Sequence, residues 1–146
     1  MFNMRTIIVC LLVASFMGSA LSVTDAQRAK AASWIRTKVG GCYSQANRHG
    51  PCYDCSSLVW HAYAQAGFSG LPPTTHGYPS SGAVTRLSST ATSNLKAGDI
   101  LYKSGHVGMY IGGGQVVNAQ NPSVGIKQHS IDSYRTWGFT AVYRVK

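Results

Sequence analysis

The 146-residue sequence predicts a single α+β domain, in which helices come first and an antiparallel sheet follows. Hydrophobic residues make up 45% of the chain and charged residues 12%, a composition that can form a buried core. Apolar residues recur at helical spacing before residue 67, and short Val-, Ile- and Tyr-rich segments follow residue 98. No internal repeat or linker that would divide the domain is visible in the sequence.

Residues 1–22 predict a secretory signal peptide. The basic start MFNMR precedes the apolar stretch TIIVCLLVASFMG, which is shorter than the about 20 apolar residues that a membrane span needs. Small residues predict cleavage after Ala20 or Ser22. We therefore expect a folded domain over residues 23–146, no membrane anchor after cleavage, and an extracellular or secretory-pathway-derived location.

The first helix is expected directly after the signal peptide. Thr24-Asp-Ala-Gln27 has the form of a capping box, in which two side chains three residues apart satisfy free backbone N–H groups. Apolar residues at helical spacing continue to Val39, and Gly40-Gly41 predicts the end of the helix.

A second helix is expected from about Cys55 to Ala66, with Gly67 ending it. Residues 68–95 are rich in Gly, Pro, Ser and Thr and show no sustained periodicity. They predict a long loop with one short element at Ala83–Leu87.

Short segments after Gly98 predict an antiparallel sheet whose strands pair in sequential order. Each segment is rich in Val, Ile or Tyr, and turns containing Gly, Pro or Asn separate them. The expected strands are Asp99–Tyr102, His106–Ile111, Gln115–Ala119, Gly125–His129 and Phe139–Val145.

The formal charge of +9 reflects thirteen Lys and Arg against four acidic residues. The basic residues are scattered, which argues against nucleic acid as a partner. Diffuse positive charge in a secreted protein fits either attraction to an anionic polymer or simple solubility. The GGG at 112–114 precedes a strand pattern and predicts a hairpin turn instead of a phosphate-binding loop.

Three cysteines follow the signal peptide: Cys42, Cys52 and Cys55. An odd number in a secreted protein predicts one disulfide and one free thiol. Cys52 and Cys55 could close a small ring, as in dithiol oxidoreductases. The polar, turn-forming residues between Cys42 and Cys52 form a loop that bends freely, so we favour that pair and expect Cys55 to be free.

Cys55 is expected at the start of the second helix, where free backbone N–H groups and the helix dipole shift a thiol from its usual pKa of about 8.5 towards thiolate. A thiolate nucleophile also needs a proton acceptor and a third group that orients the acceptor. Among five histidines, His106 is distinctive because it opens a strand after the Ser104-Gly105 turn. From the residues alone, His106 is equally well explained as the proton acceptor and as an ordinary buried histidine at the end of a strand.

Asn118 is expected near His106 across the predicted hairpin. Its amide oxygen could accept the imidazole N–H and fix the tautomer. It fits an ordinary polar residue on a half-exposed strand as well.

Three motifs, in this order, resemble the NlpC/P60 cysteine peptidases: YDCSSLVWHAYAQAG at 53–67, AGDILY at 97–102 and GHVGMYIGGGQVVNA at 105–119. The resemblance covers about residues 30–145. It implies a papain-like α+β fold, with the nucleophile at a helix N-terminus packed on an antiparallel sheet. It also implies hydrolysis of bacterial peptidoglycan stem peptides, usually between D-γ-glutamate and an L-diamino acid, without a metal or other cofactor.

On this resemblance, Cys55 is the nucleophile, His106 the general base and Asn118 the orienting residue of a catalytic triad. Family members often carry a second His where this chain has Asn118, and an Asn there should still orient the imidazole. We expect residues 23–146 to be the catalytic domain, acting as a monomer with peptidoglycan as its partner.

The resemblance also implies substrate-binding residues beside the nucleophile. Asp54, Ser56 and Ser57 flank Cys55 where the family forms the pocket for the peptide N-terminal to the cut. Tyr43 matches an upstream tyrosine that commonly lines the same subsite. Ser57 replaces the family's Gly, which would narrow the space beside the nucleophile.

The sequence leaves four alternative functions to compare with this one. The nearest is an amidase of the CHAP type, which cuts between muramic acid and L-Ala and shares the Cys-then-His order. A dithiol oxidoreductase would use Cys52 and Cys55, but Asp54 inside the pair and a third cysteine count against it. A zinc site from the cysteines and His49 matches no common spacing. A non-catalytic wall-binding protein is disfavoured because competent residues fill all three catalytic positions.

Overall fold

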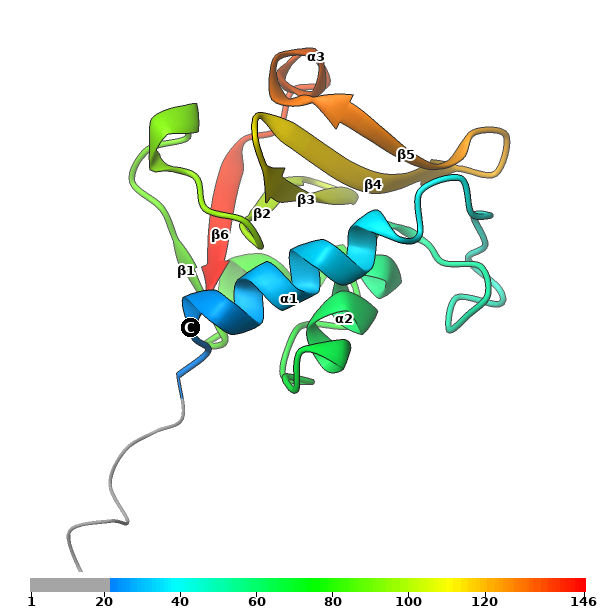
Figure 1. The fold of residues 1–146 in the computed structure, drawn as a ribbon, viewed down its shortest axis with the longest axis horizontal. Coiled ribbons are helices and arrows are strands. Elements are labelled where there is room, and N and C mark those ends of the chain that lie inside the picture. Colours follow the sequence, from blue (N-terminus) through cyan, green and yellow to red (C-terminus); the bar gives the residue numbers. More distant parts are fainter. Residues whose placement is uncertain (1–21) are drawn as a thin grey trace, which may run out of the picture.

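The computed structural model describes residues 22–146, so the predicted signal peptide lies outside the described residues except for Ser22. Figure 1 shows α1 and α2 on one side of a twisted sheet and α3 on the other. Within the described range, no helix combines the length and the apolar character needed to cross a bilayer. In chain order the elements are α1 (Asp25–Arg36), α2 (Cys55–Gln65), the 3₁₀ helix η2 (Thr75–Ser80), β1 (Val84–Arg86), the 3₁₀ helix η3 (Thr92–Asn94), β2 (Ile100–Lys103), β3 (His106–Gly112), β4 (Gln115–Asn121), β5 (Gly125–Ser130), α3 (Ile131–Arg135) and β6 (Ala141–Val145).

The predicted capping box at the start of α1 is confirmed. The Gln27 backbone N–H donates to Thr24 Oγ1 at 3.1 Å, and the Thr24 backbone N–H donates to Gln27 Oε1 at 2.9 Å. The helix ends at Arg36, three residues before its predicted end at Val39. The backbone N–H groups of residues 37–39 each bond a carbonyl three residues back, so the chain tightens into turns there.

The sheet contains six strands in the order β1-β6-β2-β3-β4-β5, and all neighbours are antiparallel. Sequential pairing is confirmed for β2 to β5. It is wrong for the last strand, because β6 returns across the sheet to lie between β1 and β2. The return path includes α3, which the sequence analysis did not predict and which Ser130 caps.

The sheet separates two apolar clusters. Side chains alternate along β3, so Val107 and Met109 face α1 and α2 while Tyr110 packs with Tyr134 of α3 on the opposite face. Gly108 is required on that second face, because a Cβ there would lie 2.7 Å from the Tyr134 hydroxyl. By the same alternation His106, the first residue of β3, belongs to the face that α3 covers.

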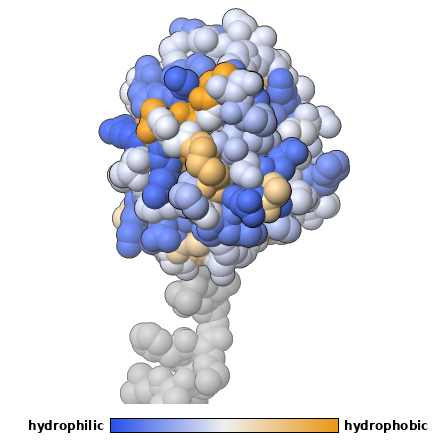
Figure 2. Space-filling model, turned by 90° about the vertical axis from the view of Figure 1, so that its right-hand side faces the viewer, coloured by the Kyte–Doolittle hydropathy of each residue, from blue (hydrophilic) through white to orange (hydrophobic). Residues whose placement is uncertain are grey.

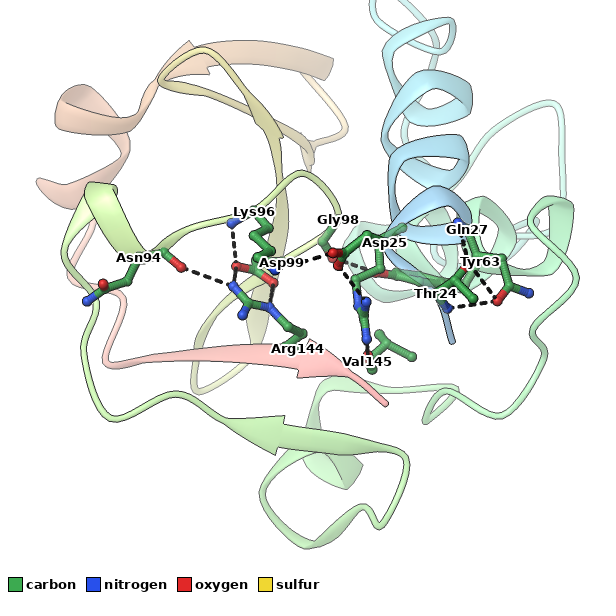
Figure 3. Close-up of polar contacts among 11 residues, drawn as sticks. Thr24, Asp25, Gln27, Tyr63, Asn94, Lys96, Gly98, Asp99, Arg144 and Val145 are labelled. Carbon is green, nitrogen blue, oxygen red and sulfur yellow. Dashed lines mark hydrogen bonds and ion pairs between the residues drawn. The ribbon is translucent and has the colours of Figure 1, made fainter. Parts of the chain in front are cut away.

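A buried ion pair ties β6 to the start of β2 (Figure 3). Arg144 Nη2 lies 2.6 Å from Asp99 Oδ2, and the Asp99 side chain is fully buried. Tyr63 of α2 donates to the Gly98 carbonyl at 2.6 Å. A Cβ on Gly98, whose φ is +97°, would lie 2.7 Å from Arg28 Cβ, so only glycine lets α1, α2 and β2 approach this closely.

Large apolar side chains are mostly in the interior. Figure 2 shows a face on which apolar residues form small patches among polar ones. Among the described residues, the exposed large hydrophobic side chains are Val39 and Val124.

Candidate active site

Cys55 is the first residue of α2, as predicted, and the residue is only 8% exposed. A second capping box fixes this helix start. The Ser57 backbone N–H donates to Asp54 Oδ1 at 2.8 Å, and the Asp54 backbone N–H donates to Ser57 Oγ at 3.0 Å. These bonds hold the thiol at the end of the helix that carries free N–H groups.

The structure brings Cys55 and the start of β3 together. The Cys55 thiol lies 4.0 Å from the carbonyl oxygen of Gly105, the residue before His106. Cys55, Gly105 and His106 all line one groove with a volume of about 340 Å³. Two residues 51 positions apart in the sequence therefore share one cavity.

Asn118 lies on β4, next to β3, and is 1% exposed. Val117 is paired with Met109, so strand alternation places Asn118 and His106 on the same face of the sheet. Both polar atoms of the Asn118 amide and His106 Nε2 are buried without a hydrogen-bond partner. No aligned hydrogen bond joins the two side chains, but their unpaired donors and acceptors are complementary.

The pKa of Cys55 is raised from its usual value, so the predicted shift towards thiolate is wrong for this arrangement. Burial is the largest cause, because it penalises the anion. The negative charge of Asp54 also raises the pKa of Cys55. The backbone N–H groups of Val107, Ser56 and Cys55 lower it, because they can donate to the thiolate. The helix start does favour the anion, but desolvation outweighs it.

Burial lowers the pKa of His106 from 6.5 to about 4. The positive charge of Lys103, its partner across the β2–β3 ladder, adds to the shift, while Asn118 opposes it. The raised pKa of Cys55 and the lowered pKa of His106 together favour a neutral thiol beside a neutral imidazole. A neutral imidazole is the form that can accept the thiol proton.

Three of the four predicted substrate-binding residues line the groove: Tyr43, Asp54 and Ser56. Burial raises the pKa of Tyr43, and the Asp54 carboxylate and the thiolate that Cys55 forms at high pH raise it further, which reflects the closeness of Tyr43 to both. Ser57 is 2% exposed, belongs to the capping box and lines a separate cavity of about 160 Å³. The structure therefore gives Ser57 a helix-capping contact instead of a place in the groove.

Arg48 is a site residue that the sequence analysis missed. Its Nε lies 3.0 Å from Asp54 Oδ2, and its Nη2 donates to Ser56 Oγ at 3.0 Å and to the Pro73 carbonyl. This cation offsets the Asp54 charge directly beside Cys55. The available signal was its position in the short loop that leads from Tyr43 to the nucleophile.

The rest of the groove comes from loops, from η2 and from β4. Its remaining lining residues, none singled out from the sequence, are Gln45, Thr74, Thr75, His76 and Gln120. Thr75 and His76 belong to η2, which lies inside the segment that the sequence predicted as an irregular loop.

The structure joins Cys42 and Cys52 in a disulfide and leaves Cys55 free, which is the favoured pairing. The Tyr53 backbone N–H also donates to the Cys42 carbonyl at 3.2 Å. Because Cys52 is bonded to Cys42, it is not available as the redox partner of Cys55. The same bond removes two of the four ligands that the zinc reading needs.

The model of the NlpC/P60 family matches residues 40–143. The chain is 38% identical over 118 residues to a protein of Corynebacterium glutamicum called a probable endopeptidase, covering 74% of this chain and 53% of that protein. It is 36% identical over 114 residues to the peptidoglycan DL-endopeptidase CwlO of Bacillus licheniformis, covering 73% of this chain and 24% of that protein. The chain thus spans about half or less of the length of these relatives.

Solved structures share the fold. NlpC2 from Trichomonas vaginalis superposes with a TM-score of 0.65 at 23% identity, over 88% of this chain and 48% of that chain. The NlpC/p60 domain of the peptidoglycan hydrolase SagA superposes with a TM-score of 0.63 at 23% identity, over 84% of this chain and 100% of that domain.

Proposed function

The chain belongs to the NlpC/P60 family, and from this premise we propose that it is a secreted cysteine peptidase that cleaves bacterial peptidoglycan stem peptides. The proposed bond joins D-γ-glutamate to an L-diamino acid. The observation that carries the proposal is the groove in which Cys55, at the start of α2, meets His106, at the start of β3. Relatives described as endopeptidases support it.

In the proposed mechanism the reaction begins from the neutral pair. His106 takes the Cys55 thiol proton as the sulfur attacks the amide carbonyl carbon. Nδ1 is the nitrogen suited to this step, because Nε2 is buried on the side away from solvent. Asn118 is assigned the role of accepting a hydrogen bond from Nε2–H through its amide oxygen, which would fix the ring and stabilise the imidazolium as it forms.

The carbonyl oxygen becomes an oxyanion, for which the backbone N–H groups at the start of α2 are the available donors. Collapse of this intermediate breaks the C–N bond, and His106 gives its proton to the leaving amine. The acyl group remains as a thioester on Cys55. His106 then removes a proton from water as the hydroxide adds to the thioester carbonyl carbon. The C–S bond of this second intermediate breaks, which releases the acid, and the departing Cys55 sulfur takes the proton from His106 to regenerate the neutral thiol.

Two features support a secreted location. The pattern of residues 1–22 is that of a signal peptide, and a disulfide between Cys42 and Cys52 suits an oxidising compartment. Cleavage of residues 1–22 would remove Arg5 from the +9 of the full sequence, and the positive charge that remains would attract the chain to an anionic cell wall.

Digestion of purified peptidoglycan followed by mass spectrometry tests the proposed bond. Fragments with a new N-terminal diamino acid are expected from the wild-type chain and not from Cys55→Ala. Glycan carrying free lactyl groups, together with intact released stem peptides, would identify an amidase instead. No soluble product from several wall types would contradict the proposed function.

A further inference from the structure

We propose that a second groove beside His106 binds a carboxylate on the amine side of the cleaved bond, with Lys103 as its specificity-determining residue. This inference rests on the proposed peptidase function and names the part of the substrate that this groove takes. The groove has a volume of about 330 Å³ and is lined by Lys103, His106, Gln120 and Trp137.

The second groove continues the first one. His106 and Gln120 line both cavities, so the two meet at the imidazole. Cys55 and Asp54 line only the first. An extended substrate can therefore cross the catalytic residues from one groove into the other.

The chemistry of the reaction assigns a side of the substrate to each groove. The acyl part becomes bonded to Cys55, whereas the leaving amine receives its proton from His106. The groove that contains Cys55 is therefore the acyl side. The groove that has His106 but not Cys55 fits the residue carrying the leaving amine.

Lys103 gives the second groove a positive charge that no carboxylate of the described chain neutralises. Its Nζ donates to the Trp137 carbonyl at 2.8 Å. None of the ion pairs among residues 22–146 includes it. An ammonium has three N–H donors, so further donors remain for a ligand.

Gln120 supplies a second donor. His129 Nε2 lies 3.2 Å from Gln120 Oε1, and this contact occupies the amide oxygen and leaves the amide NH₂ group to bond elsewhere. The Trp137 ring is held in place by His129 and Tyr134, with ring centroids 4.9 Å and 5.1 Å away. An ammonium, an amide NH₂ and a fixed aromatic wall suit a carboxylate attached to an aliphatic chain.

A stem peptide offers two such carboxylates beyond the proposed cut. One is the α-carboxylate of a diamino acid that ends the peptide. The other is the side-chain carboxylate of diaminopimelate, which lysine at the same position lacks. Both present the same chemistry to Lys103, and matched peptides distinguish them.

The test measures kcat/KM for two pairs of synthetic peptides with wild-type chain, Lys103→Gln and Lys30→Gln. One pair ends in the diamino acid with a free or amidated α-carboxylate. The other has diaminopimelate or its side-chain carboxamide in an internal position. Lys30 is exposed on α1, so its substitution removes the same charge away from the site.

Wild type should prefer the carboxylate over the amide by about tenfold in at least one pair, as expected for a charge-assisted hydrogen bond. Lys103→Gln should bring that ratio close to one, and Lys30→Gln should keep it. Equal ratios in wild type and Lys103→Gln overturn the proposal. An equal fall of kcat/KM for all four peptides in Lys103→Gln also overturns the proposal. That pattern would show that Lys103 acts only through its electrostatic effect on His106.

If wild type cleaves none of the peptides, the proposed function fails and binding still decides the groove. The Cys55→Ala chain, with and without Lys103→Gln, is then titrated calorimetrically with the same peptides. A carboxylate preference that Lys103→Gln abolishes supports the groove assignment. If the Cys55→Ala chain binds the carboxylate and amide peptides equally well, the groove assignment is overturned.

Discussion

The thiol of Cys55 lies 4.0 Å from the carbonyl oxygen of Gly105, and this contact joins the start of α2 to the turn that leads into His106. A helix N-terminus and a strand N-terminus from distant parts of the chain thus meet in one groove. The chemistry proposed for the protein depends on this meeting.

Cys55→Ala should abolish peptidoglycan cleavage and leave the fold intact. The side chain supplies the attacking atom but only a small part of a large apolar cluster. Turbidity of a wall suspension measures activity, and circular dichroism measures the fold. Retained activity in a folded variant would rule out Cys55 as the nucleophile.

Asn118→Ala should lower kcat by roughly tenfold or more, with little change in KM, because the imidazole loses the group that orients it. The unfolding free energy of the Asn118→Ala variant should equal or exceed that of the wild type. The amide it removes is buried without a partner, and an unsatisfied buried group costs about 1–3 kcal/mol. Denaturant unfolding measures this. A large loss of stability would show that Asn118 is mainly structural.

The acid limb of the kcat/KM profile should have its midpoint near pH 4 and not near 6.5, because burial lowers the pKa of His106 to about 4 and the neutral imidazole is the base. A pH-rate profile with a soluble peptide measures the midpoint. A limb at 6.5 would contradict the assignment.

The same shift makes stability depend on pH. As pH falls below 6.5, His106 becomes protonated in the unfolded chain, whereas in the folded chain it stays neutral until about pH 4. The unfolding free energy should therefore fall over this window by roughly 1.4 kcal/mol per pH unit, about 3 kcal/mol in all. His106→Gln should lack this part of the slope. Equal slopes in both proteins would refute the prediction.

Asp99→Asn should destabilise the fold by about 3–5 kcal/mol, because it leaves Arg144 with an uncompensated charge at a buried contact. Thermal and denaturant unfolding measure the loss. Asp25→Asn is the control, since Asp25 is exposed and pairs with Arg28 and Lys96 at the surface, and its loss should change stability little. Similar effects of the two substitutions would contradict the role given to the buried pair.

Replacing Cys42 and Cys52 together by serine should lower the unfolding free energy by about 3 kcal/mol, the loop-closure value for a short loop. The two cysteines are 10 positions apart. In the unreduced protein, a thiol reagent should modify Cys55 alone among these three cysteines. Labelling of Cys52 by peptide mapping would contradict the disulfide.

The sequence determined the parts of the site that local rules control. The Asp54–Ser57 capping box fixes Cys55 at the start of α2, and a glycine turn places His106 at the start of β3. Hairpin pairing then brings Asn118 to the neighbouring strand. Each depends on residues a few positions apart or on one turn, so the pattern in the chain suffices.

The tertiary structure decided what depends on burial and on distant contacts. Arg48 reaches Asp54 only because the disulfide loop folds over α2, and Lys103 and Trp137 form a groove only because α3 and β6 return across the sheet. The pKa of Cys55 is raised, whereas the helix start alone predicted a lower value, because the desolvation of the thiol depends on the whole packed molecule. No pattern of neighbouring residues contains that information.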